Sequence, residues 1–204
     1  MLFDELSLPL MCAPMSFASS AALAAACCKA GVIGGWQGGT YTPLDEFERY
    51  LDVLGRTPGA PAIVNLPSRI ATEPTGPAKL ALLEQRRVPL VLSSLGDPSR
   101  LAGRVHDWGG RLVQDVTTMR HAEKAIEAGV DGLMLTCSGA GGHTGFITPF
   151  AFVPAVRRIW DGLLIVSGGI SDAAGIAAAL ALGADIACMG TRFIATPESG
   201  VVEA

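Results

Sequence analysis

His143 is the residue of this 204-residue sequence best placed for acid–base chemistry near neutral pH. It lies in a glycine-rich segment, 138–145, directly after a short apolar run, where a strand would end in an open loop. An imidazole in such a loop can take up a proton from a substrate. His106 and His121 lie within predicted helices among polar neighbours, so we interpret both as surface residues. No second histidine or carboxylate is close to His143 in sequence, and no metal site is predicted.

Two further glycine-containing segments predict a phosphate site. Ser167-Gly168-Gly169 and Gly190-Thr191 each follow an apolar run. Glycines let the backbone approach a ligand closely, and free N–H groups at the start of a helix favour anions. The alternative is that these glycines only serve tight turns. The two segments would lie at the ends of two successive strands, and this adjacent placement favours phosphate binding.

Common nucleotide and nucleophile motifs are not found. The segment beginning at Gly139 is not G-x-G-x-x-G, because Thr144 stands where the third glycine should be. The sequence contains no G-K-[ST], so there is no Walker A loop. Thr136 occupies the first glycine position of what would be a nucleophile elbow around Ser138.

The elements that must position these residues alternate along the chain. Short apolar runs predict strands at 10–15, 32–36, 61–66, 89–95, 111–116, 131–137, 163–168 and 185–190. Segments with helical periodicity lie between them at 18–30, 43–54, 77–87, 98–108, 118–128, 150–160 and 172–182. We expect Ser171 and Thr118 to cap the helices that follow them. A weak repeat places a glycine at three helix-to-strand junctions, Gly31, Gly129 and Gly183, the last two followed by aspartate at the second position.

Strands that are apolar throughout and separated by helices indicate a parallel sheet covered on its outer face. The predicted fold class is therefore α/β, a compact (β/α)8 TIM barrel, with a doubly wound open sheet as the alternative. Only 191–204 follow the last predicted strand, and Pro197 lies among them. We therefore expect an incomplete C-terminal end, one helix short of a full barrel, in a single domain over 1–204.

Composition narrows the class of protein. Half of the residues are hydrophobic (50%) and 17% are charged, which excludes a disordered chain. With 15 Lys and Arg against 19 Asp and Glu and no basic run, a nucleic-acid partner is disfavoured. No apolar run is long enough for a membrane span. Five cysteines without framework spacing predict buried thiols in a reducing cytoplasm.

Several segments together resemble the nitronate monooxygenases, formerly called 2-nitropropane dioxygenases, which are FMN-dependent TIM-barrel enzymes. The resemblance spans the chain and keeps the order of the motifs. It is carried by 140–145 (AGGHTG), 166–170 (VSGGI), 178–185 (AALALGAD), 189–193 (MGTRF) and 195–199 (ATPES), with Pro14-Met15, Ala30-Gly31 and Asn65 agreeing earlier in the chain.

The resemblance implies a cofactor, a base and a reaction. FMN would bind through a set of residues at the strand ends, and His143 would be the catalytic residue that deprotonates the carbon next to a nitro group. The substrate would be a nitronate or another carbanion-forming small molecule, with O2 completing oxidation to a carbonyl compound and nitrite; a homodimer is allowed. The implied cofactor-binding residues are Ala13, Pro14, Met15, Asn65, Asp115, Gly142, Ser167, Gly168, Gly169, Gly190 and Thr191.

Two departures from the family pattern leave alternatives open. Asp115 stands where members commonly have Gln or Lys, and Gly139 replaces a frequent Glu. Family members commonly continue beyond the ATPES segment. We expect residues 1–204 to lack this extension. The alternatives are a FabK-like enoyl reductase, which takes hydride from NAD(P)H, and a flavin-binding protein without turnover.

Overall fold

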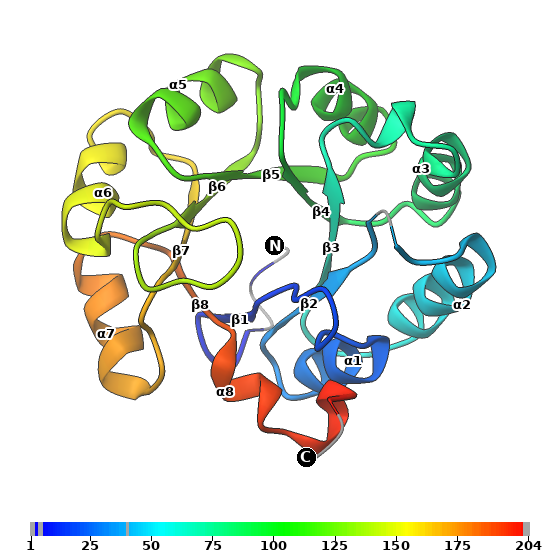
Figure 1. Cartoon of the computed structure of the whole chain (residues 1–204), viewed down its shortest axis with the longest axis horizontal. Helices are drawn as coiled ribbons and strands as arrows, with labels where there is room; N and C mark the ends of the chain where they lie inside the picture. Colours follow the sequence, from blue (N-terminus) through cyan, green and yellow to red (C-terminus); the bar gives the residue numbers. More distant parts are fainter. Residues whose placement is uncertain (1–2, 4–5, 40, 202–204) are drawn as a thin grey trace.

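The computed structural model describes residues 3, 6–39 and 41–201. Within these residues, eight parallel strands close into a barrel in chain order, with β8 pairing to β1 (Figure 1). This closed ring confirms the (β/α)8 prediction and rules out the open sheet. The strands are β1 Leu10–Cys12, β2 Ile33–Gln37, β3 Ala62–Pro67, β4 Leu90–Ser94, β5 Arg111–Val116, β6 Gly132–Thr136, β7 Leu163–Ser167 and β8 Ile186–Met189.

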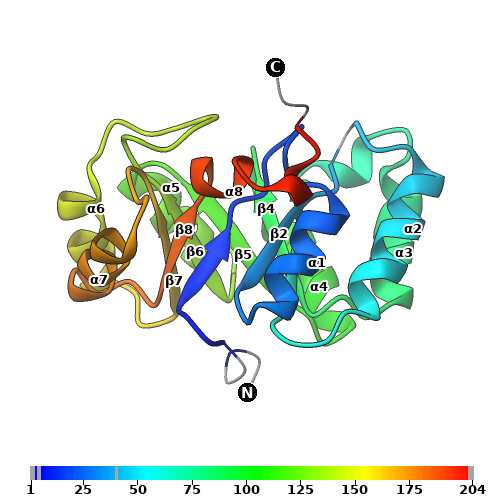
Figure 2. The ribbon, with the colours of Figure 1, turned by 90° about the horizontal axis from the view of Figure 1, so that it is seen from below.

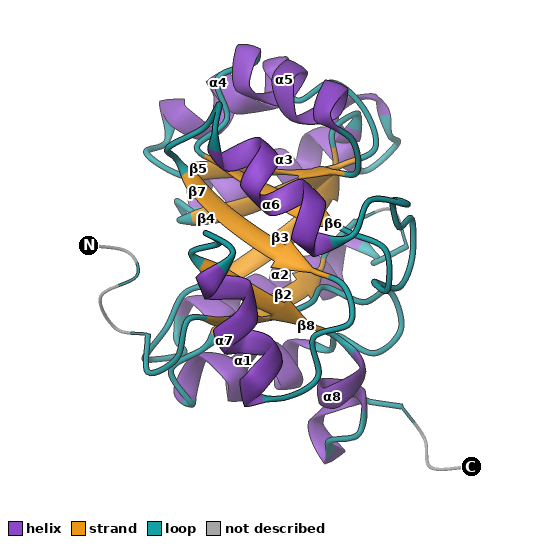
Figure 3. Cartoon of the chain, turned by 90° about the vertical axis from the view of Figure 1, so that its left-hand side faces the viewer, coloured by secondary structure: helices purple, strands orange, loops and turns teal. Residues whose placement is uncertain are grey.

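Helices cover the outside of the barrel between successive strands (Figures 1 and 3). After β8 the chain forms the four-residue helix α8 and a short 3-10 turn, η2. No helix within the described ranges is long and apolar enough to cross a membrane. The helices are α1 Ala21–Lys29, α2 Leu44–Gly55, α3 Gly76–Gln85, α4 Ser99–Asp107, α5 Met119–Glu127, α6 Pro149–Arg157, α7 Ala173–Ala181 and α8 Thr191–Ile194, with 3-10 turns η1 Ile70–Thr72 and η2 Pro197–Ser199.

The end of β1 and the cap of α7 differ from the prediction for identifiable reasons. β1 ends at Cys12, not at 15, because Ser19 Oγ accepts from the N–H of Met15 at 2.7 Å and donates to the carbonyl of Ala13 at 2.7 Å, forming a turn. The expected Ser171 cap of α7 is wrong. Asp172 caps that helix, since its carboxylate accepts from the N–H of Gly175 at 2.9 Å. The Thr118 cap of α5 is confirmed.

The apolar core is divided between the inside and the outside of the barrel. The outer cluster joins strands to helices, and the inner cluster fills the barrel as a plug. Phe3 and Leu6, which precede β1, pack against the plug, and Figure 2 places this end of the barrel opposite α8. The plug consists of Met11, Ile33, Ile63, Leu90, Leu92, Val113, Met134, Ile165, Ile186 and Cys188.

The repeated helix-to-strand junctions have one shared structure. Gly129 and Gly183 are left-handed, with φ of 78° and 109°. Two residues later, Asp131 accepts the N–H of Leu112 at 2.7 Å, and Asp185 accepts the N–H of Leu164 at 2.7 Å. Each carboxylate also binds a cation-forming side chain of an earlier helix, His106 or Arg157, at 2.8 Å. The repeat therefore fixes where β5 and β7 begin.

Two glycines that differ in backbone conformation give a stability prediction. Gly103 is inside α4 and Gly129 is left-handed with φ of 78°, and a Cβ at either position meets nothing within 4 Å. Gly103→Ala should raise the free energy of unfolding by roughly 0.5–1 kcal/mol, because alanine loses less backbone entropy in a helix. Gly129→Ala should lower it by about 1–2 kcal/mol through strain alone. Urea unfolding of both variants tests this, and equal effects would contradict it.

Candidate active site at the carboxyl end of the barrel

A ring of polar side chains lies directly above the apolar plug. Successive side chains of a strand alternate between the two faces of the sheet, so the residue two positions after a plug residue also faces inward. On several strands that next inward residue is polar and lies at the carboxyl end of the barrel, where barrel enzymes carry their active sites. These residues are Asn65 after Ile63, Ser94 after Leu92, Asp115 after Val113, Thr136 after Met134 and Ser167 after Ile165.

Asp115 is the ionisable member of this ring. Its carboxylate accepts a hydrogen bond from the hydroxyl of Thr136 on the neighbouring strand. Burial raises the pKa of Asp115 to about 6, while the Thr136 hydrogen bond and the charge of His143 act in the opposite direction.

The loop that carries His143 is exposed but held by hydrogen bonds at its base. The Thr144 hydroxyl donates to the carbonyl of Cys137 at 2.6 Å, and the N–H of Gly145 donates to the carbonyl of Thr136 at 3.0 Å. Ser138 and Ile147 join the two sides of the loop through a 2.9 Å backbone bond. Between β6 and α6 this loop lies at the same end of the barrel as α8 (Figure 2). The imidazole is thus accessible to a substrate.

The β7 glycines form a turn that touches the His143 loop. Gly168 and Gly169 have φ of 131° and 69°. The N–H of Gly169 donates to the carbonyl of Gly139 at 3.1 Å, so it holds the two loops together. A Cβ at Gly139 would lie 3.1 Å from the Gly169 nitrogen, which explains a residue without a side chain there. A Cβ at Gly169 or Gly142 would project into open space.

The ends of β1 and β8 meet on the other side of the mouth. The N–H of Ala13 donates to the carbonyl of Met189 at 2.9 Å. A Cβ at Gly190 would lie 3.4 Å from Met15 Sδ and 3.8 Å from the Ala13 side chain. Thr191 is exposed at the start of α8. The predicted cofactor-binding residues at the ends of the first and last strands are therefore neighbours. Pro14, which lies between Ala13 and Met15 in the sequence, is partly buried.

Lys79 is a buried residue of the site region that sequence reasoning missed. Its side chain is fully buried, and Nζ donates to the carbonyl of Gly39 at 2.6 Å, 5.3 Å from the centre of the Phe47 ring. Burial lowers the pKa of Lys79. The neighbouring Gly38 donates its N–H to the carbonyl of Asn65 at 3.1 Å, so Lys79 supports the loop beside Asn65. The signal that could have identified Lys79 as buried is its position on the buried face of α3, which it shares with Leu80 and Leu83.

The remaining titratable residues singled out by sequence are structural. His106 is exposed and bound to Asp131, and His121 is exposed on α5, where Nδ1 lies 3.1 Å from the Thr117 hydroxyl. Both are surface residues, as predicted. Cys12, Cys27, Cys28, Cys137 and Cys188 are buried and free, which confirms the predicted thiols.

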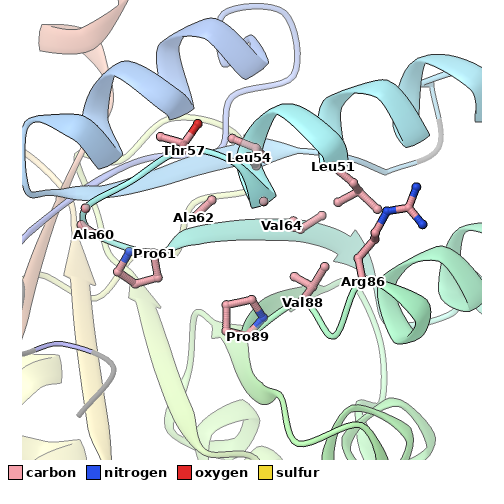
Figure 4. Close-up of a pocket in the computed structure, with 12 residues that line it drawn as sticks. Leu51, Leu54, Thr57, Ala60, Pro61, Ala62, Val64, Arg86, Val88 and Pro89 are labelled. Atoms are coloured by element: carbon pink, nitrogen blue, oxygen red, sulfur yellow. The ribbon is translucent and has the colours of Figure 1, made fainter.

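A cavity elsewhere in the molecule does not coincide with these loops. It has a volume of about 430 Å³ and lies between α2 and the segments entering β3 and β4 (Figure 4). Leu51, Leu54 and Val88 give it an apolar lining. Because it reaches the amino-terminal ends of β3 and β4, it is remote from the polar ring, and we assign the site to the carboxyl end.

Fold and site together define the class of this protein. It is a TIM barrel with glycine-rich loops and a histidine at the carboxyl end of its strands. The family model described as nitronate monooxygenase matches residues 60–204. The chain belongs to the nitronate monooxygenase family.

Individual relatives agree with this assignment. A nitronate monooxygenase from Paraburkholderia phytofirmans is 34% identical over 168 residues, covering 78% of this chain and 44% of the relative. The (3aS,4S,5R,7aS)-5-hydroxy-7a-methyl-1-oxo-octahydro-1H-indene-4-carboxyl-CoA dehydrogenase of Mycobacterium tuberculosis is 28% identical over 199 residues, covering 96% of this chain and 55% of the relative. The chain therefore spans about half the length of these curated relatives.

Solved structures show the same architecture. FabK from Thermotoga maritima superposes with a TM-score of 0.86 at 30% identity, covering 97% of this chain and 62% of FabK. The nitroalkane oxidase from Streptomyces ansochromogenes superposes with a TM-score of 0.86 at 28% identity, covering 98% of this chain and 70% of the oxidase.

The raised pKa of Asp115 predicts how stability depends on pH. Burial raises this pKa from 3.8 to about 6, so the folded chain binds more protons than the unfolded chain between these values. The stabilising contribution of the protonated form is present below pH 4 and lost as the pH rises through about 6. Asp115→Asn should therefore raise the free energy of unfolding at pH 8 by roughly 1–3 kcal/mol.

Urea unfolding of wild type and Asp115→Asn between pH 4 and pH 8 measures this effect. The exposed Asp107 at the end of α4 supplies the control, and Asp107→Asn should leave the pH dependence of wild type unchanged. Parallel stability curves for wild type and Asp115→Asn would contradict the prediction.

Proposed function

We propose that residues 1–204 form the FMN-binding barrel of a flavin-dependent oxidoreductase that oxidises nitronates and nitroalkanes with O2 to a carbonyl compound and nitrite. Family membership supports the class of enzyme. The observation that carries the proposal is His143 on an accessible loop, tied through Gly139 to the glycine turn after β7. A cytoplasmic location is also proposed, supported by the buried free thiols.

The described residues fit FMN at the carboxyl end of the barrel. Gly168, Gly169, Gly190 and Thr191 would hold the phosphate, because these turns lack side chains or open a helix. Gly169 would contribute space for the phosphate, since its N–H is already bound to the carbonyl of Gly139.

The remaining contacts would come from two sides of the mouth. Ala13, Pro14 and Met15 would lie along the flavin ring, with Gly142 opposite. Asn65, Asp115 and Ser167 belong to the inward polar ring and would face the polar edge of the cofactor.

The chain's own residues would bind the substrate and move a proton. FMN, when bound, supplies the oxidant that accepts the electrons of the substrate. His143 would take the proton from the carbon next to the nitro group of a neutral nitroalkane, leaving the electron pair on that carbon. The hydrogen-bonded base of the loop keeps this imidazole in place while its tip stays open to the substrate.

An NAD(P)H-dependent enoyl reductase is the second candidate. It is favoured by the structural likeness to FabK from Thermotoga maritima, a TM-score of 0.86 over 97% of this chain. The two candidates share FMN and the barrel, and they differ in the compound that reduces the flavin. A flavin-binding protein without turnover would bind FMN and respond to neither reductant.

Two glycines with similar left-handed φ angles but different positions test FMN binding. Gly169 and Gly129 have φ of 69° and 78°, and a Cβ at either position meets nothing within 4 Å. Gly169→Ala should weaken FMN binding at least tenfold, because its Cβ would occupy the space of the phosphate. Gly129 lies at the opposite end of the barrel, so Gly129→Ala controls for backbone strain. Fluorescence titration of the refolded chain with FMN measures both, and matching affinities would contradict the phosphate site.

The reaction is tested by anaerobic bleaching of the flavin absorbance. A preformed nitronate should bleach wild type, whereas bleaching by NAD(P)H would instead support the reductase. His143→Ala should slow bleaching by a neutral nitroalkane about 100-fold or more while retaining FMN. His121→Ala, which removes an exposed histidine of α5, should behave as wild type. Undiminished use of the neutral nitroalkane by His143→Ala would exclude His143 as the base.

A further inference from the structure

The cavity between α2 and the segments entering β3 and β4 has no part in the proposed reaction (Figure 4). Its volume of about 430 Å³ falls within the range of small-molecule sites, whereas voids inside protein cores are seldom larger than a water molecule. Leu51 and Leu54 of α2, Val64 of β3 and Val88 before β4 line it with apolar side chains. The molecule therefore holds room for a ligand away from the mouth of the barrel.

Short or rigid residues keep this space open. Gly55 ends α2 beside the cavity, and a Cβ there would meet nothing within 4 Å. Ala62 begins β3 on the outer face of the sheet, since the next residue belongs to the plug. Pro61 and Pro89 lie one residue before β3 and β4 and have no N–H. Small side chains and missing donors thus leave a cavity with little polar character.

Hydrogen-bond donors along the cavity are already engaged. The N–H groups of Thr57, Ala60 and Val88 donate to backbone carbonyls at 3.0–3.1 Å. The Thr57 hydroxyl donates to the carbonyl of Val53 at 2.8 Å. A polar ligand would lose its bonds to water on entering and would find none of these donors to replace them.

The charge at the edge of the cavity is also paired. Among the described residues that line it, Arg86 is the charged one, and its guanidinium lies at the edge of the group drawn in Figure 4. Nε donates to Asp52 at 2.9 Å and Nη2 to Glu48 at 3.2 Å, which joins the end of α3 to α2. An ion placed against the apolar lining would therefore be desolvated without an unpaired partner.

We propose that this cavity is a second binding site, which takes a neutral, mainly apolar small molecule. Burial of the ligand against Leu51, Leu54, Val64 and Val88 supplies the affinity, because apolar surface is withdrawn from water. An apolar cavity of about 150 Å³ holds benzene, so this larger volume suits a ligand of about eight to ten carbons. The site is separate from the mouth and does not depend on FMN or on the proposed reaction.

A neighbouring hollow defines the competing possibility. Thr57 lines both the cavity and this hollow, which also carries the cationic side chains of Lys29, Arg49 and Arg56. An anionic ligand would be drawn to these cations and would gain little from the apolar lining. The charge of the preferred ligand therefore decides between the cavity and the hollow.

The first test is calorimetric titration of the chain with 1-octanol, octanoate and octylammonium, which share one chain length and differ in charge. Octanol should bind at least tenfold more tightly than either ion, because neither charge finds a partner in the cavity. Tighter binding of octanoate or octylammonium would overturn the choice of a neutral ligand. No binding of octanol would overturn the site itself.

Methyl NMR of wild type locates the bound octanol. The methyl signals of Leu54, Val64 and Val88 should shift on titration, whereas those of Met15 at the mouth and Ile165 in the plug should not. Shifts at Met15 without shifts at Val88 would place octanol in the mouth and overturn the proposal. Saturating FMN should change the affinity for octanol less than twofold. If FMN does not bind, the proposed function fails, and the methyl shifts still decide whether the cavity is a site.

A pair of matched substitutions tests the cavity volume. Ala62→Leu adds three carbons to the lining and should weaken octanol binding at least tenfold, because the new side chain occupies the space of the ligand. Ala178→Leu makes the same change on the exposed side of α7 and should stay within twofold of wild type. Equal affinities in the two variants would contradict the site. Circular dichroism checks that both fold, and the methyl shifts of wild type remain decisive if Ala62→Leu does not.

Discussion

Closure of the parallel sheet between β1 and β8 is the constraint on which the rest of this structure depends. β1 contributes only three residues, yet the N–H of Ala13 reaches the carbonyl of Met189, and the N–H of Ala187 reaches the carbonyl of Pro9, each at 2.9 Å. Parallel strands require both faces to be covered. The closed ring meets this requirement with an internal plug and external helices, and it brings all strand ends to one mouth.

The alternation of side chains along each strand places the chemistry directly above the plug. A strand that contributes Val113 to the plug contributes Asp115 to the mouth, and the same step leads from Met134 to Thr136. The apolar layer withdraws Asp115 from water, which raises its pKa, and Thr136 on the next strand supplies a compensating hydrogen bond. The same strands therefore supply both the apolar plug that stabilises the barrel and the layer above it in which Asp115 ionises.

Sequence predicted most of this architecture because its signals are local. Apolar runs located all eight strands, and the repeat singled out the junction glycines Gly129 and Gly183, which the structure shows to be left-handed. Contacts between elements were not predictable in this way. Ser171 and Asp172 are both good helix caps, and only the backbone geometry selects the aspartate. Lys79 resembles a surface lysine until the Gly39 carbonyl is found beside it.

The candidate site combines an exposed base with a fixed loop, and the two requirements are met by different atoms. Glycines at 139, 141 and 142 reduce the number of side chains in the loop that carries the exposed His143. Order comes from backbone and hydroxyl contacts below the tip, through Thr144 and Gly145, and from the bond between Gly139 and Gly169. The bond between Gly139 and Gly169 reaches the turn proposed to bind phosphate, so binding of an anion there would restrain the loop that carries the base.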